Sequence, residues 1–259
     1  ELLEVLKLNP DLATGYKSGA QRARRLTEGW VRDNVFCPHC GNPKVEHLEN
    51  DKPVADFFCP HCGEQYEVKS KGGSINNRVS DGAYETMIDR ITSNSNPNFL
   101  FLSYSPSNMC VTDLVVIPKY FFVPSIIEKR PPLAHTAKRA GWVGCNVLLS
   151  SIPEQGRVFL IRNGSIIPAK QVVEKLNRTT LLSAGDVQSR GWLFDVLNCV
   201  NTIPSDEFTL TDVYKYEELL SKMHPDNRNV QAKIRQQLQL LRDAGYVEFQ
   251  GRGNYRRLH

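Results

Sequence analysis

Two identical cysteine tetrapeptides stand close together in the sequence, Cys37-Pro38-His39-Cys40 and Cys59-Pro60-His61-Cys62, with eighteen residues between them. A C-x2-C turn directs two thiolates at one ion, and two such turns complete a tetrahedral four-sulfur site. That site has no open position for water, so its zinc would stabilise the fold and would not catalyse. His39, His47 and His61 are rival ligands, but thiolates are softer and the four cysteines are better spaced. We therefore predict a structural Zn²⁺ site made by these cysteines.

Two carboxylates and a lysine, Asp56, Glu67 and Lys69, belong to the same segment. Residues 53–58 and 64–69 are rich in β-forming residues, which predicts two antiparallel strands with the second tetrapeptide in the turn. Asp56 and Glu67 would then converge from neighbouring strands. Glu67 and Lys69 would share one face, because side chains alternate along a strand.

This arrangement suits the hydrolysis of a phosphodiester, which needs a positioned water and charge neutralisation. Mg²⁺ supplies both from a shell of oxygen ligands. The predicted ligands are Asp56, Glu67 and the Val68 carbonyl, while Lys69 would polarise the water or hold the phosphate. The pattern is weak by itself, since a solvated surface hairpin can carry the same residues. The following loop, Lys71-Gly72-Gly73-Ser74, favours catalysis, because small residues let DNA approach closely, with Ser74 as a contact.

The composition is that of an ordinary globular protein, with 41% hydrophobic and 23% charged residues. No run approaches the ~18 apolar residues of a membrane span, and the acidic first residues do not resemble a signal peptide. Three of the seven cysteines stand outside the tetrapeptides, as expected of buried free thiols in a reducing compartment. These features predict a cytoplasmic protein without membrane association, and the absence of a long heptad pattern favours a monomer.

Apolar and β-rich segments predict a mixed core. The runs at 99–104, 114–117 and 158–161 are almost continuously apolar, which suits strands covered on both faces. Residues 16–33 and 81–93 have the periodicity of helices. We therefore expect an α/β (α+β) fold. The first of the two helices carries a basic surface made by Arg22, Arg24, Arg25 and Arg32.

A second unit is expected after a linker near residues 180–188. Apolar positions predict three helices in it, around 193–200, after the capping residue Thr209, and over 230–241. A turn at 251–254 then joins two β-rich segments into a hairpin. Three helices followed by a hairpin is the order of a winged helix-turn-helix.

The last part of this unit is strongly basic. Residues 221–259 contain eight basic and three acidic side chains, a net charge of +5, whereas 186–220 have a net charge of −5. A basic face suits phosphates, and Asn or Gln on a helix can pair with adenine in the major groove. The polar face of any amphipathic helix is solvated, so polarity alone does not identify a DNA contact. The candidate contacts are Arg228, Gln231, Lys233, Gln236, Arg252 and Arg256.

Several segments together resemble the DpnI-like family of methyl-directed (type IIM) restriction endonucleases. The resemblance covers nearly the whole chain. It implies a PD-(D/E)xK nuclease domain, expected over residues 1–184, joined to a winged helix over 185–259. The matching segments are Pro53-Val54-Ala55-Asp56, Glu67-Val68-Lys69-Ser70-Lys71, the zinc cysteines, Asp81-Gly82-Ala83-Tyr84, and residues 96–99, 139–146, 189–192 and 234–238.

The resemblance also implies an activity, the Mg²⁺-dependent cleavage of double-stranded DNA at GATC sites whose adenine is N6-methylated. By motif match, Asp56, Glu67 and Lys69 would be the catalytic residues. The chain has Ala55 where the general pattern has proline before the first acid. This departure is minor, because the acid binds the metal and the preceding residue does not.

Reading a methyl group requires an apolar contact in the major groove, since N6-methylation adds apolar surface there. Trp142 lies between two glycines in Gly141-Trp142-Val143-Gly144, just after Lys138 and Arg139. A tryptophan in such a segment can equally anchor a core. The resemblance favours a contact with the methylated site, with Lys138 and Arg139 beside it.

Two other functions are consistent with the same motifs. A non-cleaving, zinc-containing reader or regulator of modified DNA would use the Asp-Glu-Lys set only structurally. A nuclease with another target, such as a repair enzyme or one that cuts unmethylated sites, would keep the metal site and change the specificity. Digestion of methylated and unmethylated DNA separates all three.

Overall fold

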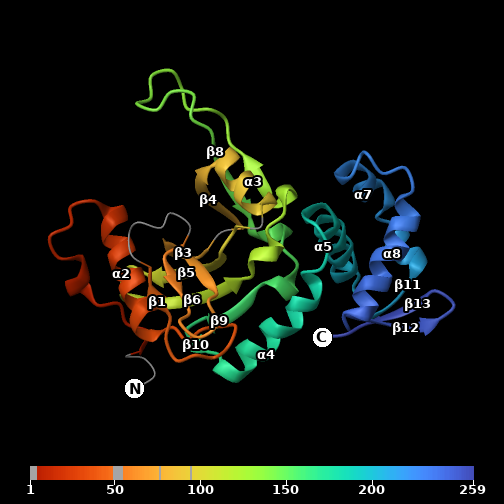
Figure 1. Cartoon of the computed structure of the whole chain (residues 1–259), viewed down its shortest axis with the longest axis horizontal. Helices are drawn as coiled ribbons and strands as arrows, with labels where there is room; N and C mark the ends of the chain where they lie inside the picture. The colour runs from red at the N-terminus through yellow and green to blue at the C-terminus, as the bar shows by residue number, and fades with distance from the viewer. Residues whose placement is uncertain (1–4, 49–54, 76, 94) are drawn as a thin grey trace. The chain divides into compact units, whose positions relative to one another are not determined.

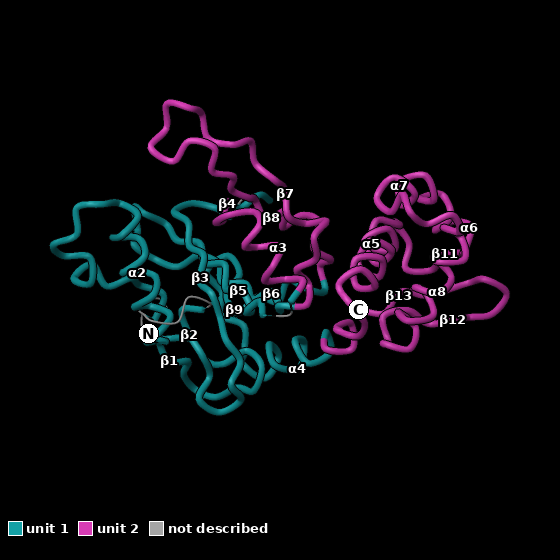
Figure 2. Tube along the Cα trace, turned by 45° about the horizontal axis from the view of Figure 1, so that its top comes forward, with its two compact units in different colours: residues 1–79, 93–119, 155–179 teal, residues 80–92, 120–154, 180–259 magenta. Residues whose placement is uncertain are grey.

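The computed structural model describes residues 5–48, 55–75, 77–93 and 95–259. Pro53 and Val54, with which the expected first strand begins, lie outside the described residues. The chain forms two compact units, each assembled from separated stretches (Figure 2). The first unit contains residues 1–79, 93–119 and 155–179, and the second contains 80–92, 120–154 and 180–259.

A seven-stranded sheet forms the centre of the first unit, in the order β1-β2-β3-β5-β6-β9-β10 (Figure 1). β3 and β5 are parallel, whereas the other neighbouring strands are antiparallel. The three apolar runs noted in the sequence lie within β5, β6 and β9, so these predictions are confirmed. The strands are β1 (Glu46–His47), β2 (Phe57–Phe58), β3 (Gln65–Gly72), β5 (Asn98–Ser105), β6 (Cys110–Ile117), β9 (Val158–Arg162) and β10 (Ser165–Ile166).

The described residues of this unit also form the helical segments η1 (Pro10–Ala13), α2 (Gly19–Asn34) and α4 (Ala169–Thr179). The helix expected at 16–33 is confirmed as α2, which buries Leu26, Trp30 and Val31 on one face. α2 lies against β3 (Figure 1), where the hydroxyls of Thr27 and Ser70 are 3.1 Å apart. The basic face of α2 is consequently held beside the strand that carries Glu67 and Lys69.

The segment expected to be helical at 81–93 begins instead as a strand, so that prediction was wrong at its start. β4 (Arg78–Ala83) alternates between exposed and partly buried residues, and α3 (Tyr84–Thr92) follows it. The helical stripe is real but shorter, with Met87 and Ile91 buried. The strand pairs into a small sheet with partners distant in sequence, in the order β4-β8-β7. Local periodicity does not reveal such partners.

That small sheet also contains β7 (Ile127–Lys129) and β8 (Gly144–Leu148), which are antiparallel. The connection between them, residues 130–143, projects beyond the sheet (Figure 1). Short 3₁₀ turns flank the sheet: η2 (Lys119–Phe121), η3 (Pro124–Ile126), η4 (Leu149–Ser151) and η5 (Glu154–Gly156).

The C-terminal part follows the expected order of helices and hairpin, with three differences. The irregular linker is short, because η6 (Thr180–Leu182) continues from α4 and α5 begins at Val187. The second helix is divided in two, α6 and α7, although its predicted capping box of Thr209 and Asp212 is present. A third strand, β11, joins the hairpin. The elements are α5 (Val187–Thr202), β11 (Glu207–Thr209), α6 (Leu210–Tyr214), α7 (Glu217–Met223), α8 (Val230–Asp243), β12 (Val247–Gly251) and β13 (Asn254–Arg257).

The expected α+β architecture is therefore confirmed. Among the described residues, every helix is too short or too polar to span a bilayer.

Candidate active site and four-cysteine cluster

The hairpin of β2 and β3 carries both the cysteines and the acids. Phe57 pairs with Tyr66 across the two antiparallel strands, as the sequence predicted. The Asp56 N–H donates to the Tyr66 carbonyl (2.9 Å), and the Val68 N–H donates to Asp56 Oδ2 (2.8 Å). The backbone of β3 thus holds both the main chain and the carboxylate of Asp56.

The second tetrapeptide makes the turn between these strands, also as predicted. The Cys59 N–H donates to the Glu64 carbonyl (2.8 Å), and the Gly63 N–H donates to the Cys59 carbonyl (2.9 Å). Gly63 has a φ of 76°, a left-handed conformation that glycine adopts without steric penalty. The first tetrapeptide closes in the same way, with the Gly41 N–H donating to the Cys37 carbonyl (2.8 Å).

The four tetrapeptide cysteines come together, with all sulfur atoms within 4.8 Å of one another. Cys37 Sγ lies 3.6 Å from Cys62 Sγ, and Cys40 Sγ lies 3.6 Å from Cys59 Sγ. Thiolates about 2.3 Å from a zinc ion sit roughly 3.8 Å apart at the corners of a tetrahedron. The cluster therefore has the size and the donor chemistry to hold zinc, and no histidine among the described residues belongs to it.

The backbone around the second tetrapeptide favours a thiolate at Cys59. Burial raises the pKa of this thiol, but hydrogen bonds from the backbone N–H groups of Cys62 and His61 outweigh it, and the pKa falls below its usual value. Burial raises the pKa of Cys37. A metal that binds this cluster must therefore displace a proton that Cys37 holds more tightly than an ordinary thiol, whereas Cys59 loses its proton more easily.

Tyr66 connects the cysteine cluster to the acidic residues. Its hydroxyl lies 3.1 Å from Cys37 Sγ and 2.8 Å from His39 Nδ1, while its carbonyl accepts the N–H of Asp56. Burial lowers the pKa of His39 to about 4, so its ring is neutral and can accept a hydrogen bond from the Tyr66 hydroxyl. Glu67 follows Tyr66 directly on β3. One fully buried residue thus contacts the cysteine cluster with its side chain and Asp56 with its backbone, and directly precedes Glu67.

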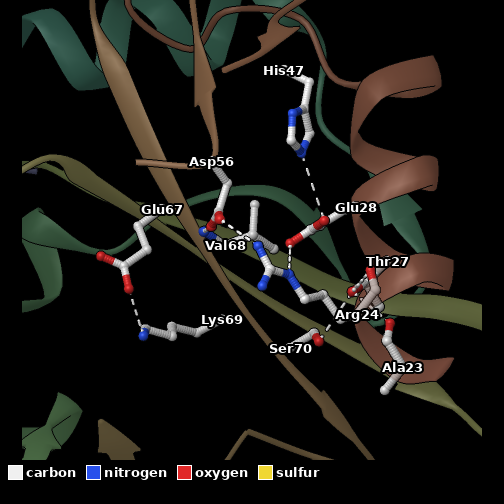
Figure 3. A network of polar contacts seen from close by, with 10 residues as sticks. All are labelled: Ala23, Arg24, Thr27, Glu28, His47, Asp56, Glu67, Val68, Lys69 and Ser70. Carbon is white, nitrogen blue, oxygen red and sulfur yellow. Dashed lines mark hydrogen bonds and ion pairs between the residues drawn. The ribbon is translucent and has the colours of Figure 1, made fainter. Parts of the chain in front are cut away.

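Asp56 and Glu28 lie in a polar network between α2 and β3, whereas Glu67 pairs with Lys69 on β3 (Figure 3). The Arg24 guanidinium bridges two acids, 2.5 Å from Glu28 Oε1 and 3.3 Å from Asp56 Oδ1. On β3, Lys69 Nζ lies 2.5 Å from Glu67 Oε1, which confirms that the two side chains share a face. Glu67 and Lys69 lie on β3 as expected, whereas Asp56 lies in a bend just before the shorter β2, where the Val68 N–H holds its carboxylate beside β3.

The network also disfavours the ionised form of Asp56. Burial is the largest cause of its raised pKa, and the nearby charges of Glu28 and Glu67 add to it. The Val68 N–H and Arg24 oppose this shift without cancelling it. Because the ionised form of Asp56 is disfavoured here, a cation bound beside the carboxylate would stabilise that form strongly.

Glu28 and Arg24 belong to this site, although sequence reasoning assigned neither to it. Glu28 also lies 3.7 Å from His47 Nε2 on β1. The available signal was that Glu28 is the single acid between Lys17 and Arg32. A lone carboxylate on a basic helix face is unusual, but only the fold shows that this face is turned toward β3.

These donors are suited to a hard divalent cation. Carboxylate oxygens are the ligands that Mg²⁺ prefers, and Asp56, just before β2, and Glu67, on β3, provide them from a hairpin whose register is fixed. The Val68 side chain packs against the core, and its carbonyl as a ligand stays a prediction. The residues present thus fit Mg²⁺, and Arg24 and Lys69 offset only part of the carboxylate charge in the structure.

The predicted methyl-reading residues lie on the connection between β7 and β8. Trp142 is half-buried, and the guanidinium of Arg139 stacks over its ring, 4.5 Å from the centroid. The ring lies on Gly144, where any Cβ would be 2.7 Å from it. Lys138 on this connection is exposed, as is Ser74 after β3. The tryptophan is thus a partly covered side chain and is not a fully buried core residue.

The candidate DNA contacts of the C-terminal part lie on α8, on the hairpin and, for Arg228, just before α8. Gln231 donates to Glu217 Oε2 (2.7 Å), and Arg256 pairs with Glu207 (3.0 Å). Arg252 occupies the two-residue turn of the hairpin with a φ of 49°. Lys233 is half-buried, whereas Arg228, Gln231, Gln236, Arg252 and Arg256 are exposed.

Comparison with known families matches nearly the whole chain. The model of the DpnI group, described as the Dam-replacing family, matches residues 4–185. The model of the Dam-replacing HTH domain matches residues 188–257. The two matches meet at the short linker before α5, and the second spans α5 through β13.

Proposed function

The chain belongs to the DpnI, or Dam-replacing, family, and on that premise we propose that it cleaves double-stranded DNA at GATC sites whose adenine is N6-methylated. Family membership supports a methylation-dependent restriction enzyme that reads modified DNA. The observation that carries cleavage is the pairing of β2 with β3, which brings Asp56, Glu67 and Lys69 together. The proposed domains are a PD-(D/E)xK nuclease over 1–184 and a winged-helix reader over 185–259.

In the proposed reaction each residue of the hairpin has a defined task. Asp56 and Glu67 hold Mg²⁺, which when bound activates the attacking water and neutralises charge on the phosphate. Lys69, kept in place by Glu67, donates to the attacking water or to a phosphate oxygen. The Val68 N–H prevents the Asp56 carboxylate from turning away. Zn²⁺ in the cysteine cluster keeps the two strands in register.

Two elements would read the modified site. Trp142, with Lys138 and Arg139, would contact the methyl group and its flanking phosphates from the nuclease domain. In the reader, α8 would enter the major groove and the hairpin turn at Arg252 would contact the backbone. A monomer with both readers would recognise the site twice, and each reader would add its own discrimination. The monomeric state and a cytoplasmic location stay predictions from the sequence.

Plasmids that carry GATC, with and without adenine methylation, test the proposal in the presence of Mg²⁺. Each reader is expected to add about 1–3 kcal/mol of discrimination, so methylated DNA should be cut on the order of a hundredfold faster or more. Mapping the ends would then locate the cut. Equal cutting of both plasmids would favour a nuclease with another target. Retention of methylated DNA without cutting would favour the non-cleaving reader.

The raised pKa of Asp56 predicts how cleavage depends on pH. Protonated Asp56 cannot bind Mg²⁺, so the single-turnover rate should fall as the pH falls through this pKa. Because burial and two neighbouring acids raise it, the fall should begin above the range of an ordinary aspartate. Glu28→Gln keeps an acceptor for Arg24 and removes one of these charges, so it should move the acidic limb to lower pH. A limb that stays in place in this variant would contradict the assignment.

A further inference from the structure

A cleft beside Asp56 has a charge and a composition that the proposed reaction does not use. Its volume is about 530 Å³, and it is formed by α2, the segment around η1 and β1. Arg24 connects it to the carboxylates, because this guanidinium lines the cleft and also pairs with Asp56. The residues that give the cleft its chemistry are Tyr16, Arg24, Arg25, Glu28, Arg32 and His47.

The walls of the cleft are basic and exposed. Three arginines and one glutamate line it, a net charge of +2 with the histidine neutral. Arg25 lies over the ring of Tyr16, 5.2 Å from its centroid, and within the described ranges it forms no ion pair. Arg32 pairs with its exposed neighbour Asp33 at 2.7 Å, an interaction that solvent screens strongly. Both guanidiniums can therefore leave their present contacts and pair with a phosphate.

The spacing of these arginines suits a chain of phosphates. Arg25 and Arg32 are seven residues apart on α2, which places them about 10 Å apart along the helix axis. They can thus contact different phosphates of one DNA strand, each through the two-pronged geometry that guanidinium offers to a phosphate. Tyr16, in the connection between η1 and α2, offers an aromatic surface for a sugar or a base.

We propose that this cleft binds the sugar–phosphate backbone of the cut DNA strand next to the scissile phosphate, with Arg25 and Arg32 as its phosphate contacts. The inference rests on the proposed function, since it takes Asp56 to mark the cut. Arg24 pairs with Asp56 and Glu28 (Figure 3), and it also lines the basic cleft. The strand thus passes from the acids, where it is cut, onto α2, where it is held without regard to sequence.

Binding of the full-length protein to a methylated GATC duplex, without divalent metal, tests the contacts. Each lost phosphate contact lowers the slope of log K against log salt by about 0.9. Arg25→Gln and Arg32→Gln together should therefore lower it by about 2 and weaken binding of methylated and unmethylated DNA alike. Arg22→Gln is the matched control, because it removes the same charge from α2 outside the cleft and should leave the slope unchanged. An unchanged slope in the double variant, or an equal effect of Arg22→Gln, would overturn the proposal.

A second measurement locates the contact and needs no folded variant for its first step. Single phosphates of the duplex are replaced one at a time by uncharged methylphosphonates. Wild-type protein should lose affinity at phosphates that flank the mapped cut, and the double variant should be insensitive at those same positions. If both proteins respond identically at every position, the cleft does not bind the backbone. Because the salt slope is measured without cleavage, a protein that fails to cut would disprove the proposed function and still allow the first test of the phosphate contacts.

Discussion

Asp56→Asn should abolish cleavage, lowering the single-turnover rate by on the order of a thousandfold, the size of effect seen when a group acting on transition-state charge is removed. The substitution keeps an oxygen that can accept the Val68 N–H, so the hairpin should stay folded. It removes the negative charge that Mg²⁺ requires. Binding of methylated DNA, measured without metal, should be unchanged or slightly tighter, because one repulsive charge is lost.

Asp113→Asn provides a matched control for that variant. Asp113 lies on β6 of the same unit, and its carboxylate also accepts a backbone N–H, from Asn163 at 2.9 Å. The same chemical change outside the hairpin should leave the rate near wild type. Cleavage by Asp56→Asn at the wild-type rate would remove Asp56 from the catalytic set. Loss of DNA binding together with cleavage would indicate misfolding or another role.

Cys59→Ser should release the metal from the cluster and also reduce cleavage, although Cys59 is no part of the carboxylate network. Wild-type protein should contain one Zn²⁺ per chain by elemental analysis, and the variant close to none. Binding of a structural zinc contributes roughly 10–16 kcal/mol in isolated fingers, so the melting temperature should fall sharply. The loss of activity follows from geometry, because the turn at Cys59 sets the register that positions Asp56 and Glu67.

Two further variants distinguish the loss of zinc from a general disruption of the fold. Cys110→Ser makes the same substitution in the same unit, where serine can still donate to the Asn108 carbonyl, so zinc content and rate should persist. Tyr66→Phe keeps the buried ring and removes only the hydroxyl that contacts Cys37 and His39. Loss of such a contact typically weakens metal binding by about 10–100-fold, measurable as faster zinc transfer to a chelator. A zinc-free Cys59→Ser protein with full activity would refute the coupling.

The parts of the site that a local pattern determines could be predicted from the sequence. Repeated C-x2-C spacing predicts a cluster because ligand geometry requires that spacing, and alternation along β3 places Glu67 and Lys69 on one face. The capping box of Thr209 and the apolar stripe of α8 are likewise local, and both are present.

What the sequence did not reveal depends on contacts between distant segments. Glu28 and Arg24 precede Asp56 by about thirty positions, and only the packing of α2 on β3 brings them to it. β4 was mistaken for the start of a helix because its partner in the sheet, β8, lies more than sixty residues later. Division of the second reader helix into α6 and α7 is equally a result of packing, since the residues between them keep helical propensity.

The network around Asp56 determines the order in which ligands can arrive at the proposed site. With every carboxyl ionised, Glu28, Asp56 and Glu67 outnumber Arg24 and Lys69, which gives a net charge of −1. A phosphodiester has the same sign and is repelled until a divalent cation changes the sum to +1. The protein can therefore rest on its recognition site through basic surfaces elsewhere while the scissile phosphate is kept away. In this proposal the scissile phosphate enters the carboxylate site only once a divalent cation is bound there, whichever of the metal and the DNA reaches the protein first.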